Sequence, residues 1–257
     1  MTDRRVRIAV QLQPEHAPDY GLIRDAVLRA EDVGVDIIFN WDHFYPLNGD
    51  LDGAHFECWT MLGAWAEQTE RVQIGALVTG GGYRNPDLLA DMARTVDHIS
   101  GGRLILGIGA GWNQKDYDSF GYEFGTPGSR LRLLAEYLPR IEHRLAVGNP
   151  AAPGSVPVLI GGGGEKKTLR LVAQHADIWH AFGDLETLTR KSAILAEHCA
   201  EVGTDPAAIE RSSSWPGADA AQGFVDAGVT LFTIGTPGPD YDLTQVREAL
   251  AWRDAQG

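Results

Sequence analysis

The sequence predicts one α/β domain folded as a closed (β/α)8 TIM barrel. Short apolar runs alternate with amphipathic helical patterns along the chain, an arrangement typical of right-handed βαβ units with a parallel sheet. Eight such repeats in 257 residues also match the usual size of this barrel. A doubly wound open sheet is the alternative. Residues 1–257 are expected to form a single domain, because no long linker interrupts them.

The apolar runs are predicted to be strands, at residues 6–12, 36–40, 72–78, 103–108, 156–160, 177–180, 209–215 and 229–234. Stretches with apolar residues at i, i+3 and i+4 are predicted to be helices, at residues 20–33, 58–69, 86–99, 130–147, 165–175, 185–202, 218–227 and 243–253. Asn85-Pro86 and Asp205-Pro206 each place a cap residue before proline, as helix starts often do. The polar run Ser212-Ser213-Ser214 makes the seventh strand the weakest.

Composition excludes several classes of partner. The chain carries 35 acidic and 22 basic residues, for a formal net charge of −13, so no basic surface for nucleic acid or an anionic membrane is expected. No apolar run approaches the roughly 18 residues of a membrane span, and no apolar segment of signal-peptide type follows the basic N-terminal residues. We therefore expect a soluble cytoplasmic protein.

Motifs for metal binding and for hydrolase chemistry are missing from the sequence. Cys58 and Cys199 lie in helical patterns without C-x-x-C spacing, so both are expected to be buried reduced thiols. The chain has no H-E-x-x-H motif, no calcium-type ladder of Asp and Asn, and no G-x-S-x-G elbow. We expect no metal site.

The end of the second predicted strand, Asn40-Trp41-Asp42-His43-Phe44, contains the strongest catalytic candidates. Chemistry in a (β/α)8 barrel collects where the carboxyl ends of the strands meet their loops. Imidazole changes its charge near neutral pH, and a neighbouring carboxylate can hold one of its tautomers. Asp42-His43 therefore predicts catalysis or ligand contact, and a simple loop cap is the alternative. Other aromatic or histidine residues near strand ends remain open as site residues: Trp41, Trp112, His16, His55 and His180.

Two glycine-rich segments predict binding surfaces. Residues 105–113 run from an apolar strand into Gly107, Gly109 and Gly111, whose bare backbone can approach a flat ligand. A structural turn is the alternative, because the spacing departs from the G-x-G-x-x-G dinucleotide fingerprint. Four glycines, Gly161 to Gly164, precede a predicted helix and suit a phosphate, with added positive charge from Lys166 and Lys167. This is not a Walker loop.

Taken in order, four segments resemble the bacterial luciferase-like monooxygenase superfamily, and most closely its branch of coenzyme F420-dependent oxidoreductases. They are residues 41–44, 83–86, 100–113 and 160–169, and the resemblance spans almost the whole chain. It implies a (β/α)8 barrel whose C-terminal face holds a flavin-like ring. It also implies a small-molecule substrate and a homodimer formed through outer helices.

The resemblance further implies roles for individual residues. His43 would lie near the reactive edge of the ring as a proton donor or charge-stabilising group, and Asp42 would contact the ring system. Ala76 and Leu77 would hold a bulged strand end, often with a non-prolyl cis peptide, against the back of the ring. The other implied cofactor contacts are Thr79, Gly80 and Asn113 at ring or ribityl atoms, and Gly162, Gly163, Gly164, Lys166 and Lys167 around the phosphate.

The leading hypothesis is an F420-dependent oxidoreductase that moves a hydride between the deazaflavin and a small organic substrate. An FMN-dependent two-component monooxygenase stays open, because both cofactors carry a tricyclic ring and a ribityl phosphate. A non-catalytic flavin-binding barrel is the third hypothesis, since fold alone does not establish chemistry. Sugar-phosphate oxidation is doubtful, because Gly111-Trp112 and Pro46-Leu47 replace that group's glutamate and tryptophan. The short segment 215–224 leaves the pocket open or covered by the loop at residues 44–56.

Overall fold

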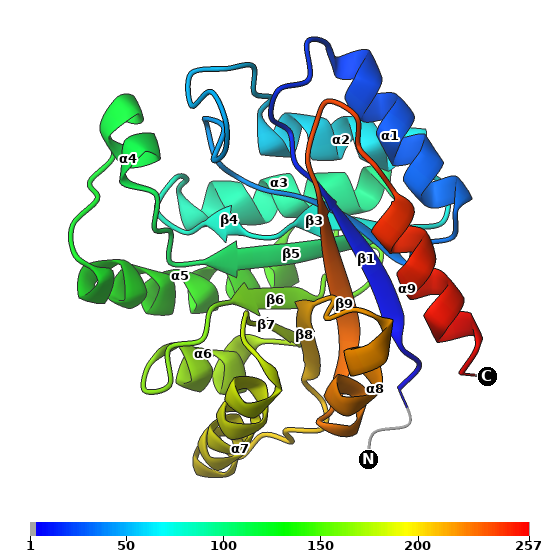
Figure 1. Cartoon of the computed structure of the whole chain (residues 1–257). Helices are drawn as coiled ribbons and strands as arrows, with labels where there is room; N and C mark the ends of the chain where they lie inside the picture. Colours follow the sequence, from blue (N-terminus) through cyan, green and yellow to red (C-terminus); the bar gives the residue numbers. More distant parts are fainter. Residues whose placement is uncertain (1–3, 257) are drawn as a thin grey trace.

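Parallel strands form a closed barrel in the computed structural model, which describes residues 4–256 (Figure 1). The strands are β1 (Arg7–Leu12), β2 (Ile37–Asn40), β3 (Gln73–Ala76), β4 (Thr79–Gly80), β5 (Leu104–Gly109), β6 (Val158–Gly161), β7 (Ile178–His180), β8 (Glu210–Ser214) and β9 (Val229–Thr236). Strand β1 pairs with β2 and β9, and β3 pairs with both β2 and β5, which closes the ring. The predicted (β/α)8 barrel is confirmed, and the open doubly wound sheet is wrong.

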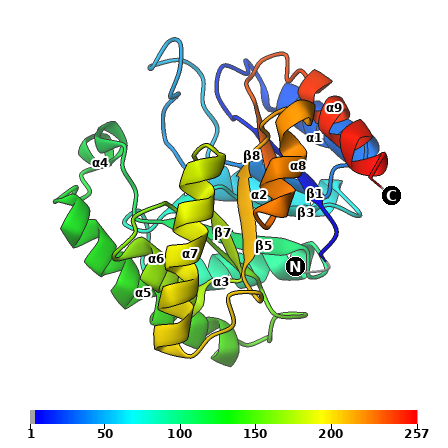
Figure 2. The same ribbon diagram turned by 60° about the horizontal axis from the view of Figure 1, so that its bottom comes forward.

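Helices surround the barrel (Figures 1 and 2). They are α1 (Tyr20–Asp32), α2 (Cys58–Gln68), α3 (Pro86–Ile99), α4 (Gln114–Phe120), α5 (Pro127–Val147), α6 (Thr168–His175), α7 (Leu185–Val202), α8 (Ala218–Asp226) and α9 (Thr244–Asp254). The predicted helices agree with these bounds within three residues, but α4 was missed because its 7 residues show too little periodicity. A turn replaces the helix expected at Asp205-Pro206. Within residues 4–256, no helix is long and apolar enough to cross a membrane.

The start of α3 is set by local sequence, as predicted. The side-chain oxygen of Asn85 accepts hydrogen bonds from the backbone N–H groups of Asp87 (2.9 Å) and Leu88 (3.3 Å), and Pro86 occupies the first turn, where its missing N–H costs nothing. This cap fixes the segment between β4 and α3, which carries Arg84, at the mouth of the barrel.

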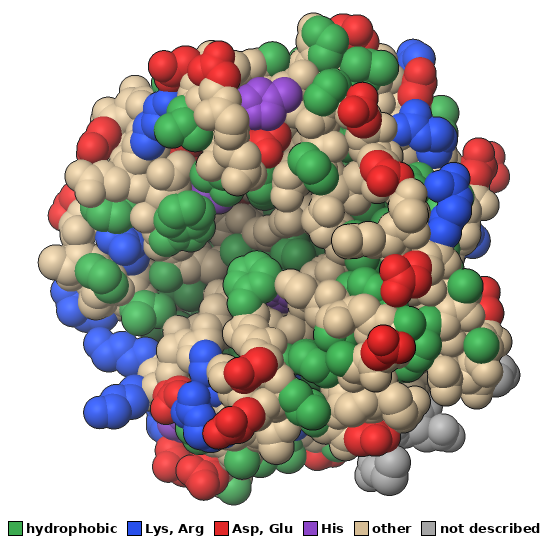
Figure 3. All heavy atoms as spheres, in the orientation of Figure 1, with side chains coloured by type: hydrophobic (Ala, Val, Ile, Leu, Met, Phe, Trp, Pro, Cys, Tyr) green, Lys and Arg blue, Asp and Glu red, His purple; other side chains and the backbone are tan. Residues whose placement is uncertain are grey.

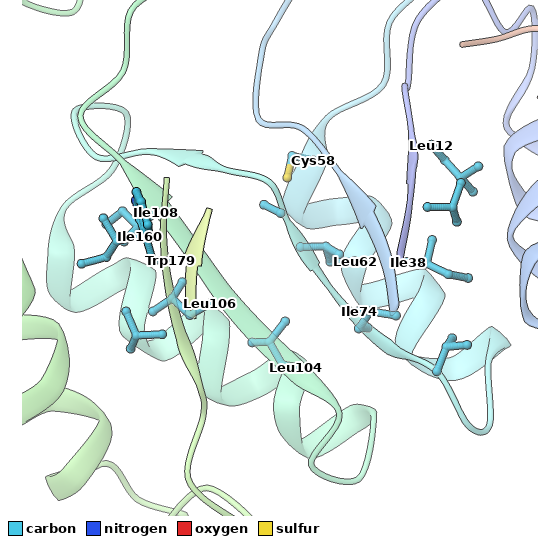
Figure 4. Packing of buried hydrophobic residues seen from close by; sticks show 14 of the residues in the cluster. Leu12, Ile38, Cys58, Leu62, Ile74, Leu104, Leu106, Ile108, Ile160 and Trp179 are labelled. Carbon is cyan, nitrogen blue, oxygen red and sulfur yellow. The ribbon is translucent and has the colours of Figure 1, made fainter. Parts of the chain in front are cut away.

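Apolar side chains fill the barrel and the space around it. The interior cluster consists of Ala9, Ile37, Phe39, Ile105, Leu159, Ile178 and Leu231. A larger cluster lies between strands and helices, and Figure 4 shows part of it, including Cys58 beside Leu62. Cys58 and Cys199 are buried free thiols, as predicted. At the amino-terminal end of the barrel, Arg7 donates hydrogen bonds to Gln73 (2.6 Å) and Glu210 (3.2 Å), which link the starts of β1, β3 and β8.

A bulge between β3 and β4 brings main chain into this mouth. The peptide bond between Leu77 and Val78 is cis, a feature that the family resemblance led us to expect here. A Cβ at Gly107 would collide with the carbonyl oxygen of Ala76, and one at Gly109 would lie 2.9 Å from Cγ2 of Val78. The bulge therefore requires a glycine at position 107, which supports the structural interpretation of that position, whereas Gly109 also lines the cavity described below.

The loop between β2 and α2 projects beyond the strand ends beside α4 (Figures 1 and 2). Lys115 of α4 donates from Nζ to the carbonyl oxygen of Leu51 (2.6 Å) and to the carboxylate of Asp52 (2.7 Å). The buried carboxylate of Glu15 accepts a hydrogen bond from the backbone N–H of Leu47 (2.8 Å). The segment expected as a cover is thus tied down on two sides at the barrel mouth.

Candidate active site

A cavity of about 800 Å³ opens at the carboxyl ends of the strands, and the face in Figure 3 is hollowed near its middle, where hydrophobic side chains gather. The predicted site residues that line the cavity are Asp42, His43, Leu77, Thr79, Gly80, Gly162 and Gly163. The predicted site residues that do not line it are Ala76, Asn113, Gly164, Lys166 and Lys167. A second cavity of about 600 Å³, around the starts of β6 and β7, contains none of these residues.

His43 is held by a carboxylate from a distant part of the sequence. It follows β2, and its Nδ1 lies 2.6 Å from Oδ2 of Asp116 in α4. Because an ionised carboxylate only accepts hydrogen bonds, Nδ1 carries a proton, and Nε2 is the ring nitrogen left to exchange a proton with a ligand. The sequence hypothesis gave this orienting role to the neighbouring Asp42. The structure corrects it, because Asp116 is the carboxylate within hydrogen-bond distance of the imidazole.

Asp116 is fully buried and accepts several hydrogen bonds. Besides His43, the Tyr83 hydroxyl (3.0 Å) and Nδ2 of Asn113 (3.0 Å) donate to Oδ2, and the backbone N–H of Phe44 (3.0 Å) donates to Oδ1. Burial alone would raise the pKa of Asp116, but the hydrogen bonds from His43, Phe44 and Tyr83 outweigh it and lower that pKa. Asp116 is therefore ionised at neutral pH and fixes one tautomer of His43.

Asp42 is paired with Arg84 instead. Nη1 and Nη2 of Arg84 donate to the two carboxylate oxygens of Asp42 at 2.6 and 3.0 Å, and Nη2 also donates to Glu57 (2.7 Å). Burial raises the pKa of the Asp42 carboxyl, and the Arg84 guanidinium opposes that rise. Asp42 thus lines the cavity as one half of a buried ion pair, so it is poorly suited to act as a free base.

Aromatic rings flank His43 at the cavity. The His43 ring makes edge contacts with Trp41 and Trp112, with centroids 5.9 and 5.5 Å apart. Nε1 of Trp41 donates to Nε2 of His55 (3.0 Å). Burial lowers the pKa of His55 to about 4, so His55 is a neutral acceptor for this bond. Both tryptophans line the cavity and give an apolar surround to the imidazole.

The glycine segment after β6 lies beside a lysine that was not predicted. Residues 161–163 line the cavity, and so does Lys191 of α7. A side chain at Gly163 would collide with Nζ of Lys191, which places this ammonium group directly against the glycine backbone. Lys166 and Lys167 are exposed and do not line the cavity. Lys191 is therefore the lysine nearest the expected phosphate position.

Two of the residues that escaped the sequence analysis carry charges close to the predicted site residues. Asp116 and Lys191 lie on helices, where an isolated charged residue carries no recognisable motif. A signal existed for Asp116 alone, because it follows Asn113 by three residues and helix geometry brings such residues to one face. For Lys191, only the packing of α7 against the end of β6 reveals its place.

Comparisons with known proteins identify relatives in the luciferase-like monooxygenase family. A model of the luciferase-like monooxygenase family matches residues 6–217. An F420-dependent glucose-6-phosphate dehydrogenase of Amycolatopsis mediterranei is 33% identical over 139 residues, which cover 53% of this chain and 40% of that protein. The chain spans about half the length, or less, of the curated relatives it matches.

Two solved structures share the fold. An F420-dependent secondary alcohol dehydrogenase in complex with an F420-acetone adduct has a TM-score of 0.82 at 18% identity, covering 93% of this chain and 96% of that chain. The oxygenating constituent of 3,6-diketocamphane monooxygenase from Pseudomonas putida, in complex with FMN, has a TM-score of 0.64 at 17% identity, covering 82% and 67%. At these identities the likeness is one of fold alone. The family match over most of its length shows that the chain belongs to the luciferase-like monooxygenase family.

Proposed function

We propose that the protein is an F420-dependent oxidoreductase that moves a hydride between the deazaflavin and a neutral alcohol or carbonyl compound. The observation that carries this proposal is the His43–Asp116 pair beside the cavity. An alcohol that loses a hydride must also lose its hydroxyl proton, and a carbonyl that gains a hydride must gain a proton. A histidine with one nitrogen fixed and the other free suits this transfer.

Nε2 of His43 accepts the hydroxyl proton of an alcohol and returns it in the reverse direction. Asp116 stabilises the imidazolium that this transfer creates, because its carboxylate lies 2.6 Å from Nδ1. Proton transfer by a positioned histidine contributes about 10²–10⁴-fold to rate. The bound deazaflavin would supply the two-electron hydride acceptor or donor.

The cavity fits such a cofactor. Its volume of about 800 Å³ lies in the usual range for small-molecule sites. Residues 161–163, the hydroxyl-bearing Thr168 at the start of α6 and the ammonium group of Lys191 line one side, and backbone N–H groups with a cation suit a phosphate. The proposed contacts of the cofactor ring are Asp42, Leu77, Thr79 and Gly80. Ala76, Asn113, Gly164, Lys166 and Lys167 stay predictions as cofactor contacts, and the homodimer likewise stays a prediction.

The surroundings of His43 favour an uncharged substrate. Trp41, Trp112 and Leu47 all line the cavity with apolar surface, and the nearest carboxylate, Asp116, is already occupied by four donors. Lys191 lies against Gly163, and Arg130 donates to the carbonyl oxygens of Gly111 and Phe124. Neither of these cavity cations is paired with His43, so an anionic substrate beside the imidazole would lose part of its hydration. A neutral alcohol or ketone with an apolar body meets no such penalty.

Fluorescence titration of the purified protein with oxidised F420, with FMN in parallel, tests the cofactor. We expect micromolar affinity for F420 and weaker binding of FMN. The reverse preference would move the protein to the FMN-dependent monooxygenases, and binding of neither would contradict both assignments. His43→Ala separates an enzyme from a binding protein, because an enzyme should keep cofactor affinity and lose most of its turnover.

Lys191→Met tests the phosphate position. We expect affinity for F420 to fall about tenfold, the loss of roughly one charge-assisted hydrogen bond, and to become less sensitive to salt. Lys166→Met is the comparison variant, because Lys166 follows the glycine segment and stays a predicted phosphate contact, but it is exposed and does not line the cavity. Equal effects of the two variants would contradict a specific role for Lys191.

A further inference from the structure

His180 lines the cavity with one ring nitrogen that no described residue satisfies. It is the last residue of β7 and is 3% exposed. Its Nδ1 lies 2.9 Å from the hydroxyl oxygen of Ser212. Nε2 is buried and lacks a hydrogen-bond partner in the described part of the chain. Buried polar atoms are almost always hydrogen-bonded in native proteins. We therefore expect a molecule bound in the cavity to form a hydrogen bond with this nitrogen.

The fold directs this side chain to the barrel interior, across from His43. Strand side chains alternate between two faces, and Ile178, two residues before His180, belongs to the interior cluster. In the ring of strands, three positions separate β2 from β7 in either direction: β1, β9 and β8 one way, and β3 with β4, β5 and β6 the other. His43, which follows β2, and His180 therefore lie on opposite sides of the mouth.

The surroundings of His180 suit an uncharged oxygen. Burial lowers its pKa to about 4, so the ring is neutral at physiological pH. A neutral imidazole nitrogen donates to or accepts from a hydroxyl, and donates to a carbonyl oxygen. Phe182 contacts the His180 ring edge to face, with centroids 5.0 Å apart, and is 74% exposed while also lining the cavity. An apolar ring beside a single polar atom matches a ligand with an oxygen on an apolar or aliphatic body.

We propose that Nε2 of His180 forms a hydrogen bond with a neutral hydroxyl or carbonyl oxygen of the molecule bound in the cavity, and that Phe182 packs against the adjoining carbon atoms. This contact is separate from proton transfer at His43. Only the identity of the ligand rests on the proposed function: the oxygen belongs either to the cofactor or to the substrate, and the two sources are distinguished below.

The experiment uses protein labelled with 15N at histidine, titrated separately with oxidised F420, FMN and cyclohexanol, a neutral alcohol. We expect the Nε2 resonance of His180 to shift with at least one of them. His180→Phe assigns the resonance and removes the hydrogen bond, whereas His180→Gln keeps a polar group that restores part of the affinity. His198→Gln is the control, because His198 also has a buried ring nitrogen without a hydrogen-bond partner among residues 4–256 but does not line the cavity.

The outcomes separate the sources. A three- to tenfold weaker affinity of His180→Phe for F420 or FMN, about the worth of one neutral hydrogen bond, assigns the oxygen to the cofactor. If His180→Phe keeps its cofactor affinity but binds cyclohexanol about three- to tenfold more weakly, the oxygen belongs to the substrate. In this variant the cyclohexanol titration is followed by the 15N resonances of His43. If no affinity changes and the Nε2 resonance moves with none of the three, the proposal is wrong. If neither cofactor binds the unaltered protein, the proposed function fails, and the cyclohexanol titration of this resonance alone decides the role of His180.

Discussion

Replacing Asp116 with asparagine tests whether α4 orients His43 for its proposed role in proton transfer. Oδ2 of Asp116 accepts from His43, Tyr83 and Asn113, and Oδ1 accepts from the backbone N–H of Phe44. An asparagine side chain has one accepting oxygen and one donating amide group. In either orientation of the amide, at least one buried donor therefore faces another donor.

The size of the effect follows from these contacts. One buried donor without an acceptor costs about 1–3 kcal/mol, which corresponds to a fall in melting temperature of roughly 2–4 °C per kcal/mol for a protein of this size. The catalytic loss should be larger, because a neutral amide neither enforces the tautomer with the proton on Nδ1 nor stabilises the imidazolium of His43. We expect kcat to fall about 10²-fold or more, up to the 10⁴-fold that proton transfer supplies.

The measurements are thermal unfolding and steady-state turnover with an alcohol identified by screening. Asp118→Asn is the control, because Asp118 is an exposed carboxylate on the same helix and its replacement should change neither quantity appreciably. Turnover of Asp116→Asn within twofold of the unaltered protein would refute the orienting role.

The pH dependence of stability supplies a second check on Asp116. Its pKa is lowered in the folded protein, so its contribution to stability is present above the pKa of the unfolded chain. That contribution disappears as pH falls through the lowered folded value. The difference in stability between the unaltered protein and Asp116→Asn should therefore shrink in acid, and a constant difference from pH 7 to pH 3 would contradict the lowered pKa.

Two further predictions concern the frame of the site. In a urea titration, Gly107→Ala should lower the free energy of unfolding by about 1–3 kcal/mol or more, because the new Cβ meets the carbonyl oxygen of Ala76. The control is Gly63→Ala in α2, where the space around the new Cβ is open. This variant should raise the free energy of unfolding by about 0.5–1 kcal/mol. Arg84→Met leaves the Asp42 carboxylate buried and unpaired, at a cost of about 3–5 kcal/mol at neutral pH. Without Arg84 the pKa of the Asp42 carboxyl rises further, so Asp42 binds a proton more readily in the folded than in the unfolded state. The free energy of unfolding of this variant should therefore increase as the pH is lowered from 7 to 5. Equal urea midpoints at both pH values would count against the pairing of Asp42 with Arg84.

Periodicity predicted most of the fold, because barrel strands and their covering helices bury one regular face or stripe. It failed where structure depends on distant partners. Residues 72–78 were predicted as one strand, but the chain breaks into β3 and β4 around the bulge at Leu77. The polar run at β8 looked weak, yet the strand forms because its hydroxyl groups find partners: Ser213 donates to the carbonyl oxygen of Ala181 (3.0 Å), and Ser212 lies beside Nδ1 of His180.

The site was predicted better in position than in chemistry. Strand ends locate the mouth of a barrel, so the sequence pointed to His43 and to the glycine segment at residues 161–163, both of which line the cavity. The partner of His43 could not be found in this way, because adjacency in sequence favoured Asp42. Successive residues after a strand point in different directions, and Asp42 turns to Arg84.

Because Asp42 pairs with Arg84 and Asp116 pairs with His43, the two acidic groups at the mouth of the barrel differ in their surroundings. Asp42 has two of its hydrogen bonds to a permanent cation, Arg84, and so braces the segment between β4 and α3. Asp116 has its hydrogen bonds to an imidazole, a hydroxyl, an amide and a backbone N–H group, and among these donors only the imidazole has a second nitrogen that can take up a proton. A proton that reaches Nε2 of His43 is therefore stabilised by an anion with no competing cation among these donors. The position of α4, the helix that periodicity missed, thus favours His43 over Asp42 as the proposed proton carrier.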